Sequence, residues 1–374
     1  MPNKSPSRRA AGLLVLAILL DGCARAPAPA PVTEIRVSAA AYAAAPRRSL
    51  SVVATLCDGV TGDCEFGDAV AAEPDVADGV LVWDYGRPLR RYDRTGHRLP
   101  DLGRKGKGPG EYEIAVAAGR SGDSIAVVDI ASLRIARFDS GGGFIRFDPL
   151  RNIPQTTRAM KFVQGDLVVH SIQPRGDGAG STFRSVRMRA DGSDTLARHE
   201  LPGYLSKAGQ FQEVPGLFSA RPVWAVRPDG TVLVSPGSSY EIWEYRNGTA
   251  LRQVTVEQAP RPVEQSEIDR ERERRLARAI PAMRAALEDA MRRAATTHPS
   301  VTELVALKDG GILVREAEDV AGDSVRWTRF DSDWHPSGHV VTAASTRVLL
   351  VQGERMLMQE QDSAGTALRW WMVP

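Results

Sequence analysis

Short runs of alternating apolar and polar residues recur along the chain from Asp78 to Pro374. Period-two alternation with many Val, Ile, Trp, Tyr and Phe residues predicts β-strands, and Asp-Gly, Asn-Gly and Gly-Asp pairs between the runs predict hairpin turns. Gly and Asp suit such turns because the backbone there needs a positive φ. The first copy of this pattern spans Asp78 to Leu99, and the second spans Gly122 to Phe147.

The corresponding turns of successive copies fall near residues 79, 122, 165, 230, 310 and 353, so three intervals are 43 residues long. That length is typical of a four-stranded propeller blade. We therefore predict an all-β fold, a six-bladed β-propeller over residues 32–374. A third strand rich in Arg and aromatic residues is expected in most copies, for example over 185–192, 240–248 and 325–333.

The sixth copy ends at Pro374 after only three strands. A propeller avoids open edges when its first and last blades share strands. We expect an N-terminal strand, either Val32 to Ala40 or Ser49 to Leu56, to complete the last blade. The alternative is a pair of sandwiched sheets or an open repeat array, which would not explain the missing strand.

The strand pattern breaks between Arg261 and Ser300, before the predicted fifth blade. Apolar residues recur there at helical spacing, Ser266 and Asp269 resemble a capping box, and Pro281 should divide the segment or kink it. The simpler interpretation is a helical arm packed over the propeller rim. The functional interpretation is a lid or a docking element for a partner.

Residues 1–22 have the pattern of a secretory signal, in which basic residues precede an apolar run from Ala10 to Leu20. The run ends in Leu-Asp-Gly-Cys23, which resembles the bacterial lipobox and implies lipidation of Cys23. Residues 23–31 are rich in Ala and Pro and would form an extended tether. We expect a lipid-anchored cell-envelope protein, at the outer membrane because Ala24 follows the cysteine. The alternative is an ordinary signal peptide with an incidental cysteine.

Cys57 and Cys64 are the other two cysteines of the chain. In an exported protein, two cysteines separated by a short glycine-containing segment favour a disulfide. The alternative is a redox or metal-binding pair, but further ligand residues are missing from the neighbouring sequence.

The glycine-rich stretch from Leu102 to Tyr112 carries Arg104, Lys105 and Lys107. Its amides and cations could bind an anion. It lacks the Gly-Lys-Ser/Thr ending of a phosphate loop and precedes a strand, which favours a connection between blades. Asp331 and Asp333 are compatible with oxygen ligation, but His335 and His339 flank Pro336 and Gly338, so we predict a turn and no metal site.

The blade pattern resembles NHL-like six-bladed β-propellers, and within them exported bacterial lipoproteins. The resemblance rests on the run from Gly106 to Glu111, the Phe-Asp pairs at Phe138 and Phe330, and the helical insertion. It implies the fold, but it supplies no family catalytic motif. In the third copy His170-Ser171 replaces the expected Asp.

The formal net charge is only +2, so the chain does not have the excess of basic residues that is typical of nucleic-acid-binding proteins. We expect a monomer that meets the membrane only through its lipid, needs no cofactor, and binds a protein, peptide or glycan. The alternative is a periplasmic hydrolase or lyase with its site in the central channel. Acids with strongly shifted pKa in that channel would favour the enzyme, and an exposed apolar rim near the insertion would favour the binding module.

Overall fold

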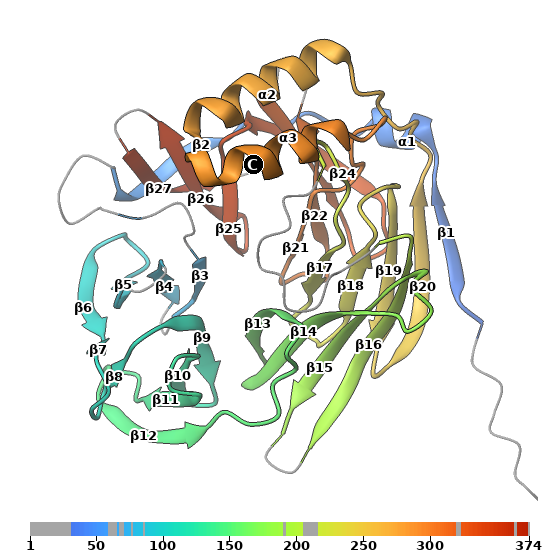
Figure 1. Cartoon of the computed structure of the whole chain (residues 1–374). Helices are drawn as coiled ribbons and strands as arrows, with labels where there is room; N and C mark the ends of the chain where they lie inside the picture. The colour runs from blue at the N-terminus through green and yellow to red at the C-terminus, as the bar shows by residue number, and fades with distance from the viewer. Residues whose placement is uncertain are drawn as a thin grey trace, which may run out of the picture. The chain divides into compact units, whose positions relative to one another are not determined.

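Antiparallel sheets recur where the alternating pattern predicts strands, and they follow one another round a ring (Figure 1). The computed structural model describes residues 31–58, 66, 71–75, 78–84, 87–189, 192–204, 216–318, 323–362 and 365–372. Residues from Pro31 onward belong to one compact unit. The described residues form six blades, which confirms the predicted six-bladed β-propeller.

The first three blades are each built from four strands that are consecutive in the chain. Blade 1 contains β3 (Ala71–Pro74), β4 (Val80–Trp83), β5 (Leu89–Tyr92) and β6 (Arg98–Leu102). Blade 2 contains β9 (Ala115–Ser121), β10 (Ser124–Asp129), β11 (Arg134–Phe138) and β12 (Phe144–Pro149). Blade 3 contains β13 (Thr157–Val163), β14 (Asp166–Pro174), β15 (Gly180–Met188) and β16 (Ser193–Pro202). Between blades 1 and 2 lies a small parallel pair, β7 (Arg104–Lys105) and β8 (Glu111–Tyr112).

Of the other three blades, blades 4 and 6 also use a strand from the N-terminal part of the chain, whereas blade 5 is again built from four consecutive strands. Blade 4 contains β17 (Val223–Val226), β18 (Val232–Ser235), β19 (Glu241–Arg246) and β20 (Thr249–Val256), with β1 (Thr33–Val37) added at its outer edge. Blade 5 contains β21 (Glu303–Ala306), β22 (Ile312–Glu318), β23 (Ser324–Phe330) and β24 (Pro336–Ala343). Blade 6 contains β25 (Arg347–Gln352), β26 (Arg355–Asp362) and β27 (Gly365–Met372), with β2 (Ser51–Cys57) as its outer strand.

The ring closes because β2 pairs antiparallel with β27, from Ser51 opposite Met372 to Cys57 opposite Leu368. Of the two candidates for the closing strand, Ser49 to Leu56 is therefore the right one. An apolar cluster fills each of the six junctions between neighbouring blades, including the junction of blades 6 and 1. Burial of these clusters supplies the main force that holds the blades together.

The recurring turn of the sequence pattern joins the first and second strands of each blade. Gly122, Gly165, Gly230, Gly310 and Gly353 all have positive φ at this turn, and in blade 1 Asp78 takes this role with φ 59°. Predicted third strands are also found, as β15, β19 and β23.

The N-terminal segment runs over the outer edges of blades 4, 5 and 6. β1 pairs parallel with β20, and helix α1 (Ala39–Ala43) follows. Tyr42 of α1 is buried against Tyr240 and Phe330, and its hydroxyl donates a hydrogen bond to the Glu316 carboxylate. Burial, reinforced by Glu316, raises the pKa of Tyr42 to about 12. The strand Val32 to Ala40, our other candidate for ring closure, therefore extends blade 4 instead.

Strand direction divides the propeller into two faces. The segments that link one blade to the next, such as 103–114 and 257–302, lie at one end of the strands, which we call the connection face. The turns between first and second strands lie at the other end, the turn face. Because β1 is parallel to β20, a fourth strand that runs toward the connection face, Thr33 lies at the turn-face end.

The predicted helical insertion lies between blades 4 and 5. It contains α2 (Gln265–Arg278), a 3-10 turn η3 (Pro281–Met283) and α3 (Arg284–Arg292) (Figure 1). Pro281 divides the helices, as expected, at the first position of η3. The capping box is formed by Glu264 and Glu267, so its assignment to Ser266 and Asp269 was wrong. No helix in the described ranges is long and apolar enough to cross a membrane.

Candidate functional site

The first strands of all six blades line a central cavity of about 290 Å³. Most of the residues that line it have apolar side chains, Met160, Val305 and Leu349 among them. Small residues in the first strands allow side chains of the second strands to reach the cavity. Ala71 lies opposite Trp83 and Ala159 lies opposite His170, and all four line the cavity. The cavity is therefore the concave site in which a propeller of this kind could hold a small ligand.

An ion pair crosses this cavity from blade 1 to blade 3. Lys161 Nζ lies 3.1 Å from Glu73 Oε1, and the two side chains are 43% and 15% exposed. Glu73, Gly119 and Lys161 occupy the same register position in the first strands of blades 1, 2 and 3. A Cβ at Gly119 would lie 2.9 Å from Phe162 Cβ, so the glycine allows the first strand of blade 3 to approach closely. Burial raises the pKa of Glu73, although Lys161 acts in the opposite direction.

Glu303 of blade 5 also lines the cavity, and the described residues provide no hydrogen bond or ion pair for its carboxylate. Burial raises the pKa of Glu303, while the charges of Arg315 and Arg347 partly oppose this effect. Arg315 is the cross-strand neighbour of Glu303, but its guanidinium donates to the Thr302 hydroxyl and the Ala344 carbonyl. The cavity thus holds a carboxylate that lacks a direct partner.

His170 forms an aromatic wall with Phe183 and Trp224. The ring centroid of His170 lies 5.8 Å from that of Phe183 and 5.7 Å from that of Trp224. Burial lowers the pKa of His170 to about 3, with a further contribution from Lys161, so its imidazole is neutral near pH 7. Nδ1 of His170 is buried, and the described residues provide no hydrogen-bond partner for it. His170, where the sequence departs from the repeat, is therefore part of the channel wall.

The base of the insertion is held by a buried polar cluster around Glu267 of α2. Its carboxylate accepts hydrogen bonds from Arg261 Nη1 at 2.8 Å and from the Glu264 amide at 2.9 Å, and it lies 3.1 Å from His298 Nε2. Burial acts to raise the pKa of Glu267, but these hydrogen bonds outweigh it and lower the pKa to about 2. The cluster joins both ends of the insertion and so fixes its position on the connection face.

Further along the insertion, apolar side chains are exposed to solvent. Ile280 is 61% exposed and Met283 is 46% exposed, whereas Leu287 and Ala290 of α3 are buried. The stretch from Arg270 to Arg284 has six arginines and two glutamates. The insertion therefore presents two apolar side chains within a basic segment.

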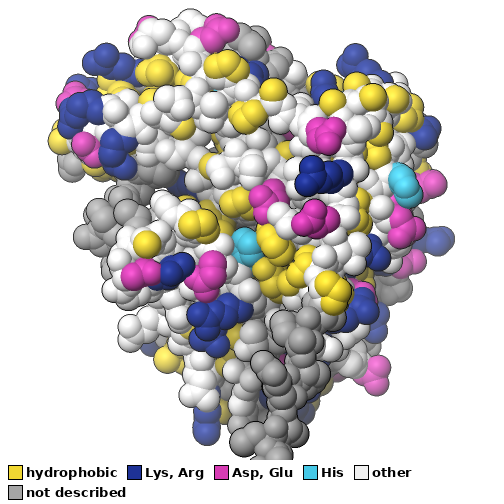
Figure 2. Space-filling view, turned by 90° about the vertical axis from the view of Figure 1, so that its right-hand side faces the viewer, with side chains coloured by type: hydrophobic (Ala, Val, Ile, Leu, Met, Phe, Trp, Pro, Cys, Tyr) yellow, Lys and Arg dark blue, Asp and Glu magenta, His cyan; other side chains and the backbone are white. Residues whose placement is uncertain are grey.

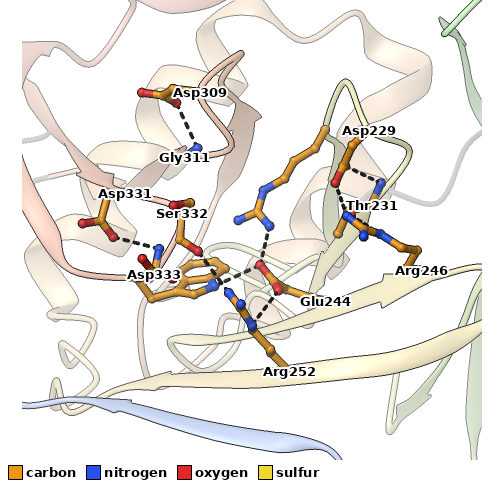
Figure 3. A network of polar contacts seen from close by, with 12 residues as sticks. Asp229, Thr231, Glu244, Arg246, Arg252, Asp309, Gly311, Asp331, Ser332 and Asp333 are labelled. Carbon is orange, nitrogen blue, oxygen red and sulfur yellow. Dashed lines mark hydrogen bonds and ion pairs between the residues drawn. The ribbon is translucent and has the colours of Figure 1, made fainter.

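A second buried network joins blades 4 and 5 on the turn face (Figure 3). Glu244 Oε1 accepts hydrogen bonds from Arg227 Nη1 at 2.6 Å and from Trp334 Nε1 at 3.0 Å. Arg252 lies beside Glu244 and donates to the Ser332 carbonyl in the neighbouring blade at 3.0 Å. Arg227, Trp334 and Arg252 all contact Glu244 and so connect the two blades, although Nε and Nη2 of Arg227 are buried without a hydrogen-bond partner among the described residues. We assign this network to blade packing.

The glycine-rich loop folds around Glu111, an acidic residue of the loop itself. Glu111 accepts hydrogen bonds from Arg104 Nε and the Gly108 amide, both at 2.7 Å, and Lys107 lies 3.7 Å from Glu113. The Gly108 amide, followed by Arg104, lowers the pKa of Glu111. Lys105 is exposed. The loop connects blades 1 and 2, and anion binding by Arg104, Lys105 and Lys107 stays a prediction.

The structure describes only some of the other residues for which the sequence predicts a role. Cys23 and Cys64 lie outside the described residues, whereas Cys57 is buried at the end of β2, so both the lipidation and the disulfide stay predictions. His335 lies in a turn held by Asp331, but Pro336 and Gly338 belong to β24, so the predicted turn ends earlier than expected. No group of metal-binding side chains is found in the described part of the chain.

The inner charges Glu73, Lys161 and Glu303 were missed by the sequence reasoning. The available signal was a single charged residue within an otherwise apolar first strand, but sequence alone does not show which strand of a blade faces the channel. The surface gives no comparable signal, because acidic and basic side chains are interspersed on the face seen in Figure 2.

Comparison with known proteins supports the fold alone. No known protein family and no curated protein matches the chain. A candidate exported protein from Bacteroides fragilis superimposes with a TM-score of 0.51 at 10% identity, over 91% of this chain and 100% of that one. A member of the DUF4221 family from Bacteroides vulgatus gives 0.46 at 8% identity, covering 88% and 99%. The PQQ-bound aldose sugar dehydrogenase from Streptomyces coelicolor gives 0.45 at 13% identity, also covering 88% and 99%. The chain is thus a six-bladed β-propeller whose structural neighbours include a bacterial protein described as exported.

Proposed function

We propose that this protein is an NHL-like cell-envelope lipoprotein, anchored through Cys23, that acts as a binding module for another protein. The observation that carries the proposal is the insertion, which exposes Ile280 and Met283 on a rigidly held base. Exposed apolar side chains that a fold holds in place are typical of protein-binding surfaces. They meet the criterion that favours a binding module.

The charge around these side chains indicates the kind of partner. Arg284 directly follows Met283 in the chain, and Arg272 lies in α2; both are exposed and form no ion pair within the described residues. A partner with an acidic surface around an apolar anchor would complement them. A protein segment of that composition is therefore the occupant that we propose.

The direction of the chain supports this role. Thr33 begins β1 at the turn-face end of blade 4, whereas the insertion lies on the connection face. The chain therefore enters the propeller at the face opposite the insertion. In our proposal the anchor at Cys23 leaves the insertion accessible to a periplasmic partner.

A photo-reactive amino acid placed at position 280 in cells tests the proposal. We expect cross-links to one protein, identified by mass spectrometry, with the contact in an acidic segment. Introducing Arg272→Glu and Arg284→Glu should abolish the cross-link while protein abundance is unchanged. The matched control is the same probe at Ile145, which is 48% exposed on blade 2. The same set of cross-links at both positions, or none at position 280, would refute the docking role.

Mass spectrometry of the mature N-terminus tests the anchor separately. We expect a lipid-modified Cys23 at the N-terminus, and release of a Cys23→Ser variant from the membrane fraction. An unmodified mature chain that begins elsewhere would leave the docking surface intact but would exclude the lipoprotein assignment.

A second candidate function is a hydrolase or lyase with its site in the channel. Burial raises the pKa of both Glu73 and Glu303, and acids with shifted pKa values are often found at catalytic sites, which favours this candidate. A screen of ester, glycoside and lactone substrates checks it, with Glu303→Gln as the comparison. Turnover that depends on Glu303 would support an enzyme, and equal turnover by both proteins would exclude this site.

A further inference from the structure

The charged side chains that line the central cavity favour a ligand with a positive charge. Its lining includes two carboxylates, Glu73 and Glu303, and one ammonium, that of Lys161. Lys161 already lies 3.1 Å from Glu73. Glu303 is left without a direct partner in the described structure, because the guanidinium of Arg315 contacts Thr302 and Ala344. A largely buried carboxylate without a partner is costly, and a bound cation would offset that cost.

The walls around Glu303 suit an organic cation better than a metal ion. Trp224 and Trp83 line the same cavity, together with the His170 ring, which packs against Trp224. Tryptophan is the side chain that attracts ammonium groups most strongly through its ring face. The remaining lining residues have apolar side chains, which supply no oxygen ligands, whereas hard metal ions need six or more.

Anionic ligands and neutral ligands fit the central cavity less well than a cation. An anion would have to compete with Glu73 for Lys161 and would lie in a cavity that already contains a second carboxylate. A neutral apolar ligand would displace water from Glu303 without replacing its interactions. The cavity volume of about 290 Å³ is at the low end of small-molecule sites, which begin at about 300 Å³.

We infer that the central channel is a binding site for a small organic ammonium ion, with Glu303 as its counter-ion and Trp224 as its aromatic wall. This site is independent of the proposed docking surface on the insertion. It uses side chains of the inner strands, so it would remain if the insertion had no partner.

Isothermal titration calorimetry on the purified full-length protein tests the inference with probes of matched shape. Phenethylamine, 2-phenylethanol and 3-phenylpropionate share a ring and differ in charge, and methylammonium and tetramethylammonium test smaller cations. We expect at least one ammonium probe to bind, and phenethylamine to bind at least about 10-fold more tightly than the alcohol. We expect no binding of the carboxylate.

Substitutions assign the binding to the channel. Glu303→Gln should weaken ammonium binding by about 10-fold or more, as loss of a charge-assisted contact would, and Trp224→Leu should also weaken it. Glu354→Gln removes an exposed carboxylate on the turn face and should leave binding unchanged. Circular dichroism and the unfolding midpoint establish that each variant is folded. Equal affinity for the three phenyl probes, no binding of any ammonium probe, or unchanged binding by folded Glu303→Gln would overturn the inference.

Discussion

Arg91 of blade 1 and Glu244 of blade 4 occupy the same position in the third strands of their blades, with opposite charges. Arg91 pairs with Leu81 in the sheet register, and Glu244 pairs with the equivalent Leu233. Arg91 Nε donates to Asp75, whereas Glu244 accepts from Arg227, and Asp75 and Arg227 each follow the first strand of their blade. Both side chains also bond to the neighbouring blade, at the Ser140 carbonyl and at Trp334 Nε1. The same junction is therefore built twice with the charges exchanged.

This equivalence predicts that the charges of blade 4 can be exchanged. Glu244→Arg alone should lower the free energy of unfolding by about 3 kcal/mol or more, because it places a third arginine beside Arg227 and Arg252. Adding Arg227→Asp should recover at least half of the loss, since it recreates the pairing of blade 1. Urea unfolding of the two single variants and the double variant measures the coupling. Additive losses in the double variant would show that the two junctions are not interchangeable.

Removing Lys161 from the ion pair across the channel should destabilise the fold mainly because the Glu73 carboxylate loses its partner. Lys161→Met should lower the free energy of unfolding by about 1–3 kcal/mol, because Glu73 then lacks its partner. Glu73→Gln combined with Lys161→Met should restore most of that stability. Lys308→Met, at an exposed position, is the control. If the double variant is no more stable than Lys161→Met, the pair does not account for the effect.

The cluster under the insertion predicts a stability that depends on acid pH. The pKa of Glu267 is about 2 in the folded protein and near 4.5 in its ordinary state. Its contribution is therefore present above pH 4.5 and is lost as the pH falls toward 2. The difference in unfolding free energy between the parent and Glu267→Gln should reach about 3 kcal/mol near pH 7 and shrink over this window. Glu288→Gln, on the exposed side of α3, should show no such pH dependence.

Two glycines with similar backbone angles should respond differently to alanine. Gly103 has φ 66° and Gly122 has φ 64°. A Cβ at Gly103 would lie 2.7 Å from the Gly110 carbonyl oxygen and 2.8 Å from Tyr112 Cε1, whereas a Cβ at Gly122 would contact nothing within 4 Å. Gly122→Ala should cost about 1 kcal/mol from backbone strain, and Gly103→Ala clearly more. Thermal unfolding of both variants checks the order, and equal shifts in Tm would contradict it.

The predicted Cys57–Cys64 disulfide is checked by alkylation and mass spectrometry of the exported protein. We expect neither cysteine to be alkylated until a reductant is added. Free thiols at both positions without reductant would exclude the disulfide.

Local sequence pattern was sufficient for the architecture. The alternation of residues, the recurring Gly and Asp turns and the unfinished last copy predicted six blades, ring closure and the insertion with its break at Pro281. These features depend on neighbours in the chain, because turns and strands are set by φ preferences and by period-two burial. The choice between the two N-terminal strands required the tertiary structure, since both have strand patterns and only pairing distinguishes β1 on blade 4 from β2 on blade 6.

The candidate site depended almost entirely on the tertiary structure. Glu73, Lys161 and Glu303 lie in three different blades, and 230 positions separate Glu73 from Glu303 in the chain. Closing the ring brings their strands around one cavity, where Glu73 and Lys161 form an ion pair. Conversely, Arg104 and Lys107 are adjacent to glycines in the sequence, but Glu111 and Glu113 pair with them in the folded loop. Short-range pattern therefore specified the blades, whereas the charges that face one another were determined by which blades the closed ring places together.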